Sequence, residues 1–134
     1  LTGEQRGIST VFDPSFPERL PMVFDKEKIR RVFANVIGNA LKYSNTGGAV
    51  TISYEQKNGE HIVTVADKGI GIPAAEQKNI FATYYRASNA QKHDAHGTGM
   101  GLRLIKQLLE LHNGRIWFES KEGEGTTVYV ALKA

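Results

Sequence analysis

The spacing of hydrophobic residues along the chain predicts two helices. Residues 26–43 and 99–111 both carry apolar side chains at intervals of three and four, the pattern of a helix with one buried face. The inward positions are Ile29, Val32, Phe33, Val36, Ile37, Ala40 and Leu41 in the first helix and Leu102, Ile105, Leu108 and Leu109 in the second. Asp25 fits the N-cap of the first helix, and Gly114 is expected to end the second, since glycine is favoured just past a helix end.

The remaining apolar segments are short and predict strands. They cover residues 6–12, 50–56, 61–66, 115–120 and 126–132. Asn58 and Gly59 favour a tight hairpin turn between the second and third of these strands. No repeat or linker interrupts the pattern, so a single domain over residues 1–134 is expected. Helices combined with a mixed or antiparallel sheet predict a two-layer α/β sandwich.

Residues 67–98 break this pattern. Their apolar positions are interrupted, and residues 87–95 are polar without a clear period. We therefore expect a mobile loop with short helical pieces in this part of the chain. Long loops in compact domains are usually functional or disordered, so this segment is a candidate for function.

Composition narrows the class of protein. The 134 residues are 40% hydrophobic and 23% charged, which is typical of a globular domain. The absence of cysteine excludes disulfides and thiolate metal sites. No apolar run approaches the ~20 residues that cross a bilayer, and no signal peptide is visible at Leu1. The net charge is +3, but basic residues are scattered among acidic ones, so no nucleic-acid partner is expected.

Polar residues form a stripe on the first predicted helix. On a helical wheel Asn35, Asn39 and Lys42 fall within a narrow arc beside Arg31, and the apolar residues occupy the opposite side. Amide oxygens can bind Mg²⁺, which also takes phosphate oxygens, and a lysine one turn on can reach a phosphate. A solvated helix face with no ligand is the alternative.

A glycine-containing turn follows the strand at residues 61–66. Residues 67–73 have the sequence Asp-Lys-Gly-Ile-Gly-Ile-Pro. A partly shielded carboxylate at Asp67 could accept a hydrogen bond from an exocyclic amine, and Gly69 and Gly71 would let the backbone approach a flat ring. Such a site would select adenine over guanine. An ordinary turn is the alternative, since aspartate and glycine are common turn residues.

A second glycine cluster opens the last predicted helix. Residues 96–102 have the sequence His-Gly-Thr-Gly-Met-Gly-Leu. Glycines there would expose N-terminal N–H groups, which favour an anion such as phosphate. The segment is no Walker loop and matches the Rossmann fingerprint poorly, because a polar loop precedes it. A flexible hinge that caps the helix is the alternative.

These motifs together resemble the catalytic and ATP-binding domain of sensor histidine kinases, in the superfamily shared with DNA gyrase, MutL and heat-shock chaperone ATPases. Residues 35–44 resemble the N box, 67–73 the first glycine box, 80–87 the F box and 97–102 the second glycine box. The resemblance implies a Bergerat-type fold, with a mixed, mostly antiparallel sheet of about five strands packed on three helices. It also implies a mobile ATP lid at about residues 72–98.

The resemblance assigns roles to individual residues. The residues expected to bind the nucleotide are Asn35, Asn39, Lys42, Tyr43, Asp67, Gly69, Gly71, Ile72, Arg86, Gly97, Thr98, Gly99, Met100, Gly101 and Leu102. Asn39 is the implied Mg²⁺ ligand, and Asp67 is the implied acceptor for the adenine amino group. Arg86 would sense the terminal phosphate or hold the lid. No catalytic residue is assigned, because the family's phosphoacceptor histidine and its acidic neighbour lie on a separate helical hairpin, expected upstream of Leu1.

The implied function is donation of the γ-phosphoryl group of magnesium-ATP to that histidine. The implied partners are the histidine-bearing dimerisation domain of the same protein and a response-regulator receiver domain. The parent is expected to be a homodimer with this fragment a monomeric cytoplasmic domain, whether the parent is membrane-anchored or soluble. Two alternatives stay open, an ATP-binding regulatory module without transfer and an ATPase like gyrase or MutL. That ATPase needs a general-base carboxylate near the N box, where Arg31 and Asn35 stand.

Overall fold

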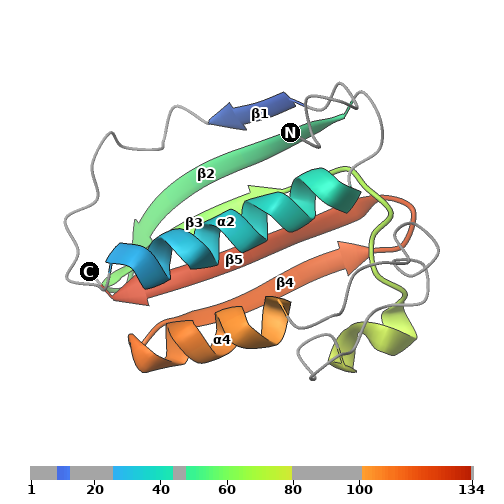
Figure 1. The fold of residues 1–134 in the computed structure, drawn as a ribbon. Helices are drawn as coiled ribbons and strands as arrows, with labels where there is room; N and C mark the ends of the chain where they lie inside the picture. Colours follow the sequence, from blue (N-terminus) through green and yellow to red (C-terminus); the bar gives the residue numbers. More distant parts are fainter. Residues whose placement is uncertain (1–8, 13–25, 44–47, 80–100, 134) are drawn as a thin grey trace.

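The computed structural model describes residues 9–12, 26–43, 48–79 and 101–133, which fold into two layers (Figure 1). The elements are β1 (Ser9–Phe12), α2 (Lys26–Tyr43), β2 (Ala49–Lys57), β3 (Glu60–Ala66), the 3₁₀ helix η1 (Ala74–Asn79), α4 (Gly101–Leu111), β4 (Arg115–Lys121) and β5 (Gly125–Lys133). The two-layer α/β fold expected from the hydrophobic pattern is confirmed.

The strands form one sheet in the order β1-β2-β3-β5-β4. β1 is parallel to β2, and the other neighbouring pairs are antiparallel. The predicted hairpin between β2 and β3 is confirmed, since Lys57 pairs with Glu60 around Asn58 and Gly59. Both turn residues have positive φ, 52° and 75°, the conformation that makes Asn-Gly the favoured pair for such a turn.

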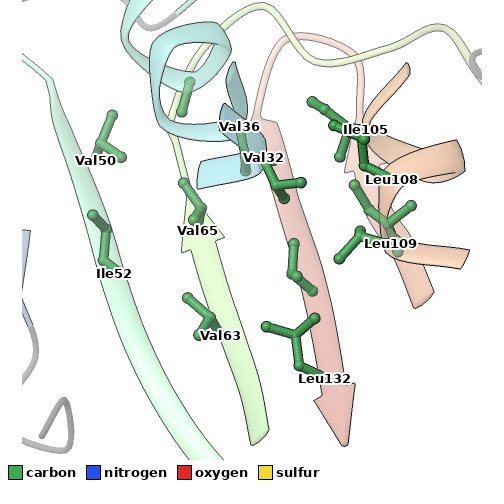
Figure 2. Close-up of a cluster of buried hydrophobic side chains, with 13 residues drawn as sticks. Val32, Val36, Val50, Ile52, Val63, Val65, Ile105, Leu108, Leu109 and Leu132 are labelled. Atoms are coloured by element: carbon green, nitrogen blue, oxygen red, sulfur yellow. The ribbon is translucent and has the colours of Figure 1, made fainter. Parts of the chain in front are cut away.

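Both long helices lie on the same face of the sheet (Figure 1). Alternate residues of β3 are buried beneath them, which is the period-two pattern of a strand with one covered face. The core is aliphatic, as Figure 2 shows: α2 contributes Val32 and Val36, α4 contributes Ile105, Leu108 and Leu109, and the strands contribute Val50, Ile52, Val63, Val65 and Leu132. Burial of such side chains contributes about 1.5–3 kcal/mol each.

The end of α4 differs in one detail from the sequence prediction. Asn113, and not Gly114, adopts the left-handed conformation, with φ of 57°. The N–H of Gly114 donates to the carbonyl of Leu109 at 2.7 Å, and the N–H of Asn113 donates to that of Glu110 at 3.1 Å. This is a Schellman motif, in which asparagine can replace the usual glycine because it tolerates the left-handed region.

His61 is a polar residue within the core. It lies on the covered face of β3 and is only 3% exposed. Its Nδ1 is hydrogen-bonded to the hydroxyl of Tyr54 at 2.6 Å, and its Nε2 has no partner among the described residues. His61 is therefore a residue of the core. No helix in the described part of the chain combines the length and apolar character needed to span a bilayer.

Candidate functional site

The predicted ligand-binding segments gather at one end of the sheet. Figure 1 shows that the C-terminal end of α2, the segment that follows β3, the β4–β5 turn and the N-terminal end of α4 all lie there. The antiparallel pairing places them together, because β3 ends and β5 begins on the same side of the sheet. The topology thus brings the polar stripe of α2 and the segment of Asp67 to the end of the sheet where α4 begins.

Asp67 follows directly after β3 and is held by backbone N–H groups. Its own N–H donates to the carbonyl of Thr126 at 2.9 Å, which extends the ladder between β3 and β5. Its Oδ1 accepts from the N–H of Gly69 at 2.9 Å and from the N–H of Thr126 at 3.2 Å. Within the described chain both hydrogen bonds to this carboxylate end on Oδ1, so Oδ2 is the oxygen left for a ligand.

Partial burial raises the pKa of Asp67 above its ordinary value of 3.8. The N–H groups of Gly69 and Thr126 act in the opposite direction, because they stabilise the ionised form, but the effect of burial is larger. A carboxylate that has lost part of its hydration gains more from a hydrogen-bond donor than one in water does. Asp67 is thus a preorganised acceptor for an N–H group.

Gly71 has a structural reason for being glycine that the sequence did not show. It has a φ of 66°, and a Cβ there would collide with the carbonyl oxygen of Lys121 and lie 2.9 Å from the Cα of Glu122. The close approach is therefore to the β4–β5 turn of the same chain. The N–H of Gly123 donates to the carbonyl of Ile70 at 2.8 Å, which fixes the two segments to each other.

Ser120 and Gln77 complete this contact, and the sequence prediction missed both. The hydroxyl of Ser120 accepts from the N–H of Ile72 at 2.8 Å. The side-chain amide of Gln77 donates to the carbonyl of Ile72 at 3.0 Å and to that of Ser120 at 2.9 Å. The sequence did hold one signal for Ser120. Ser120 lies on the same face of β4 as the buried Ile116, and a buried polar side chain needs hydrogen-bond partners.

Asn35 and Asn39 border the core. The helical wheel placed them on the side opposite to the apolar residues, and this prediction was wrong. Both are half-buried beside the fully covered row of Val32, Val36 and Ala40. The Nδ2 of Asn35 donates to the carbonyl of Arg31 at 2.9 Å, within its own helix. This bond uses one of the two Nδ2 protons of Asn35, so the second proton is left for an acceptor and Oδ1 for a cation or a donor.

Several predicted residues lie outside this description. Arg86, Gly97, Thr98, Gly99 and Met100 fall beyond the described residues. The side chains of Lys42, Tyr43 and Leu102 also lie outside the description, although their backbones belong to α2 and α4, as does that of Gly101. The described residues contain no group of three His, Cys, Asp or Glu that could hold a metal.

Comparison with known families identifies the protein family of the chain. The model of the family described as Histidine kinase-, DNA gyrase B-, and HSP90-like ATPase matches residues 24–134. The chain belongs to this family. Among curated proteins, this ATPase domain is 40% identical over 124 residues to the sensor histidine kinase WalK of Bacillus subtilis, covering 90% of the chain and 20% of that protein. It is 37% identical over 132 residues to the sensor protein kinase WalK of Staphylococcus aureus, covering 96% of the chain and 32% of that protein.

Solved structures share the fold of this ATPase domain. The mycobacterial sensor histidine kinase MprB matches with a TM-score of 0.80 at 24% identity, over 98% of this chain and 88% of that one. The catalytic domain of histidine kinase ThkA matches with a TM-score of 0.79 at 25% identity, over 97% and 81%. The resemblance to histidine kinase ATPase domains is confirmed, and the chain spans about a fifth to a third of the curated relatives' length.

Proposed function

We propose that this ATPase domain binds magnesium-ATP and donates the γ-phosphoryl group to a histidine on a separate dimerisation domain of its parent kinase. The half-buried carboxylate of Asp67 carries this proposal. Two backbone N–H groups fix its Oδ1 and leave Oδ2 for the adenine amino group. Guanine presents an oxygen at the corresponding position, which a carboxylate would repel.

Asn39 is the proposed ligand of the magnesium ion. It is half-buried in α2, whose C-terminal end lies at the same end of the sheet as the segment that follows β3 (Figure 1). An amide oxygen suits Mg²⁺, which prefers oxygen ligands and usually shares phosphate oxygens. When bound, the ion would offset the negative charge of the phosphates. Asn35 uses one Nδ2 proton on the carbonyl of Arg31, so its second Nδ2 proton would be available to the same phosphates.

The composition of α2 argues against an ATPase that activates water by itself. Residues 28–54 contain no aspartate or glutamate, so neither α2 after its first turn nor the start of β2 supplies a general-base carboxylate. Phosphoryl transfer needs a positioned acceptor as much as a bound donor. We therefore propose that the acceptor histidine, and the acid beside it, come from outside this chain.

The proposed partners follow from the proposed transfer of the phosphoryl group. They are the histidine-bearing dimerisation domain of the same protein and the receiver domain of a response regulator, in a homodimeric parent. A cytoplasmic location is part of the same proposal, because ATP is available there. A mobile lid at residues 72–98 is also proposed, and of this range only residues 72–79 lie within the description.

Two measurements test the proposal. Isothermal titration calorimetry of the 134-residue chain should give magnesium-dependent ATP binding that is much tighter than GTP binding. Labelled ATP with an added dimerisation hairpin of a relative should then label the histidine of that hairpin. ATP binding without transfer in the full-length parent would favour a regulatory module, and steady ATP hydrolysis by the chain alone, lost in Asn35→Ala, would favour a gyrase-like ATPase.

A further inference from the structure

Ser120 lies at the centre of the contact between the Asp67 segment and the β4–β5 hairpin. Its hydroxyl group has three neighbours within hydrogen-bond distance: the N–H of Ile72 at 2.8 Å, the carbonyl of Gly125 at 3.0 Å and the hydroxyl of Thr126 at 2.7 Å. Ser120 is half-buried and pairs with Thr126 across the two strands. Its three bonds therefore connect both strands of the hairpin to the segment that follows Asp67.

Proton counting fixes the direction of each bond. A serine hydroxyl has one proton and two acceptor sites. The N–H of Ile72 can only donate and the carbonyl of Gly125 can only accept, so the proton of Ser120 goes to Gly125. Thr126 must then donate its hydroxyl proton to Ser120. Every site on Ser120 is satisfied, which makes the arrangement directional as well as close.

This arrangement bears on Asp67 from two sides. On one side, Thr126 is held by Ser120 through its side chain, and its backbone N–H donates to Oδ1 of Asp67. On the other side, Ser120 fixes the N–H of Ile72, while Gln77 fixes the carbonyl of the same residue. The carboxylate thus sits on a segment that is anchored before and after its turn.

We infer that Ser120 is a positioning residue that sets the adenine selectivity of the site, by holding the carboxylate of Asp67 in place through Thr126 and Ile72. The inference rests on the proposed function, because it assumes that Asp67 accepts from the adenine amino group. The ligand class it concerns is purine nucleoside triphosphates that differ at the 6-position. Loss of Ser120 would leave the phosphate contacts of α2 intact and misplace the acceptor.

The test compares two ligands by calorimetry on the full 134-residue chain with Mg²⁺. The ligands are ATP and purine riboside triphosphate, which lacks the 6-amino group. The wild type should prefer ATP, and Ser120→Ala should reduce that preference roughly three- to tenfold, the range for one net protein hydrogen bond. Ser120→Thr restores a hydroxyl and suits a strand, so it should recover most of the preference. Ser53→Ala makes the same change at a half-buried position of β2 and should leave it unaltered.

Each result has one meaning. An equal loss for both ligands in Ser120→Ala, or no loss, would overturn the inference, because a merely structural role would not distinguish the 6-amino group. Wild-type protein that binds neither ligand would instead overturn the proposed function. Should Ser120→Ala fail to fold, Ser120→Cys has nearly the same shape and much weaker hydrogen bonds, and the same loss of preference is required of it.

Discussion

Gly71 and Lys121 approach so closely that no side chain fits between them. A Cβ atom on Gly71 would lie 2.7 Å from the carbonyl carbon of Lys121 and closer still to its oxygen. The contact joins the segment after β3 to the β4–β5 turn. It places Asp67 at a junction of two parts of the chain that are far apart in sequence, so the geometry of the proposed adenine site depends on both.

Replacing Gly71 tests this junction. Gly71→Ala adds a steric collision with backbone to a φ of 66° that alanine disfavours, so we expect it to destabilise the fold by at least ~3 kcal/mol. Gly123→Ala is the matched control, because Gly123 has a φ of 83° and nothing described lies within 4 Å of its added Cβ; it should cost about 1 kcal/mol. Urea unfolding measures both. Similar costs for the two variants would mean that the junction can relax.

Asp67→Asn should weaken ATP binding by about tenfold or more and leave the fold intact. A hydrogen bond to a charged group contributes roughly 1.5–3 kcal/mol, and an asparagine amide can present a donor in place of the acceptor. Calorimetry gives the affinity, and the circular dichroism spectrum checks the fold. An unchanged affinity would remove Asp67 from the site. GTP binding should be less affected than ATP binding, since guanine gains nothing from the carboxylate.

The raised pKa of Asp67 predicts two opposite dependences on pH. The folded state holds this proton more tightly than the unfolded state, so the contribution of Asp67 to stability is present at low pH and is lost as the pH rises from 3.8 through the raised pKa. ATP affinity should fall as the pH drops through the same range, because the protonated carboxyl no longer accepts at both oxygens. ATP affinity is measured against pH for the wild type and for Asp67→Asn, and the variant serves as the control for the protonation of ATP itself. Identical pH profiles for the two proteins would contradict the prediction.

Asn39→Ala should abolish the magnesium-dependent part of ATP affinity. We expect a loss of at least about tenfold in Mg²⁺, which is typical even when a residue that only supports a metal ligand is removed. Little change should remain in EDTA. Gly38→Ala is the neighbouring control: Gly38 is exposed, an added Cβ meets nothing described within 4 Å, and alanine should stabilise α2 by roughly 0.5–1 kcal/mol. Equal losses in Mg²⁺ and EDTA would point to a role without metal.

Tyr54→Phe should destabilise the fold by about 1–3 kcal/mol. The variant removes the hydrogen bond to Nδ1 of His61 and leaves both ring nitrogens of a buried imidazole without a partner among the described residues. Thermal or urea unfolding measures the cost. In a His61→Leu background the same tyrosine change should cost much less, and an equal cost in both backgrounds would show that the pair is not coupled.

Local chemistry made most of the elements predictable. Val32, Val36 and Ala40 recur at helical spacing and are buried together, and the Asn58–Gly59 turn follows from the left-handed conformation that its residues tolerate. The same reasoning placed Asp67 at a strand end, where it is found. It misjudged the burial of Asn39, which at ~100° per residue lies next to Val32 on the wheel and so belongs to the edge of the apolar face.

The sequence by itself determined most elements of this protein and its class, and it supplied the candidate residues for a nucleotide site, because these depend on side-chain type and on spacing over a few residues. Only the tertiary structure decided how Asp67 is held. Thr126 bonds to its carboxylate, while Ser120 and Lys121 contact Ile72 and Gly71 of the same segment. These contacts exist because the order β3-β5-β4 brings the last hairpin beside the end of β3. Contacts between segments so far apart in sequence leave no periodic pattern, so their partners emerge only when the sheet is assembled.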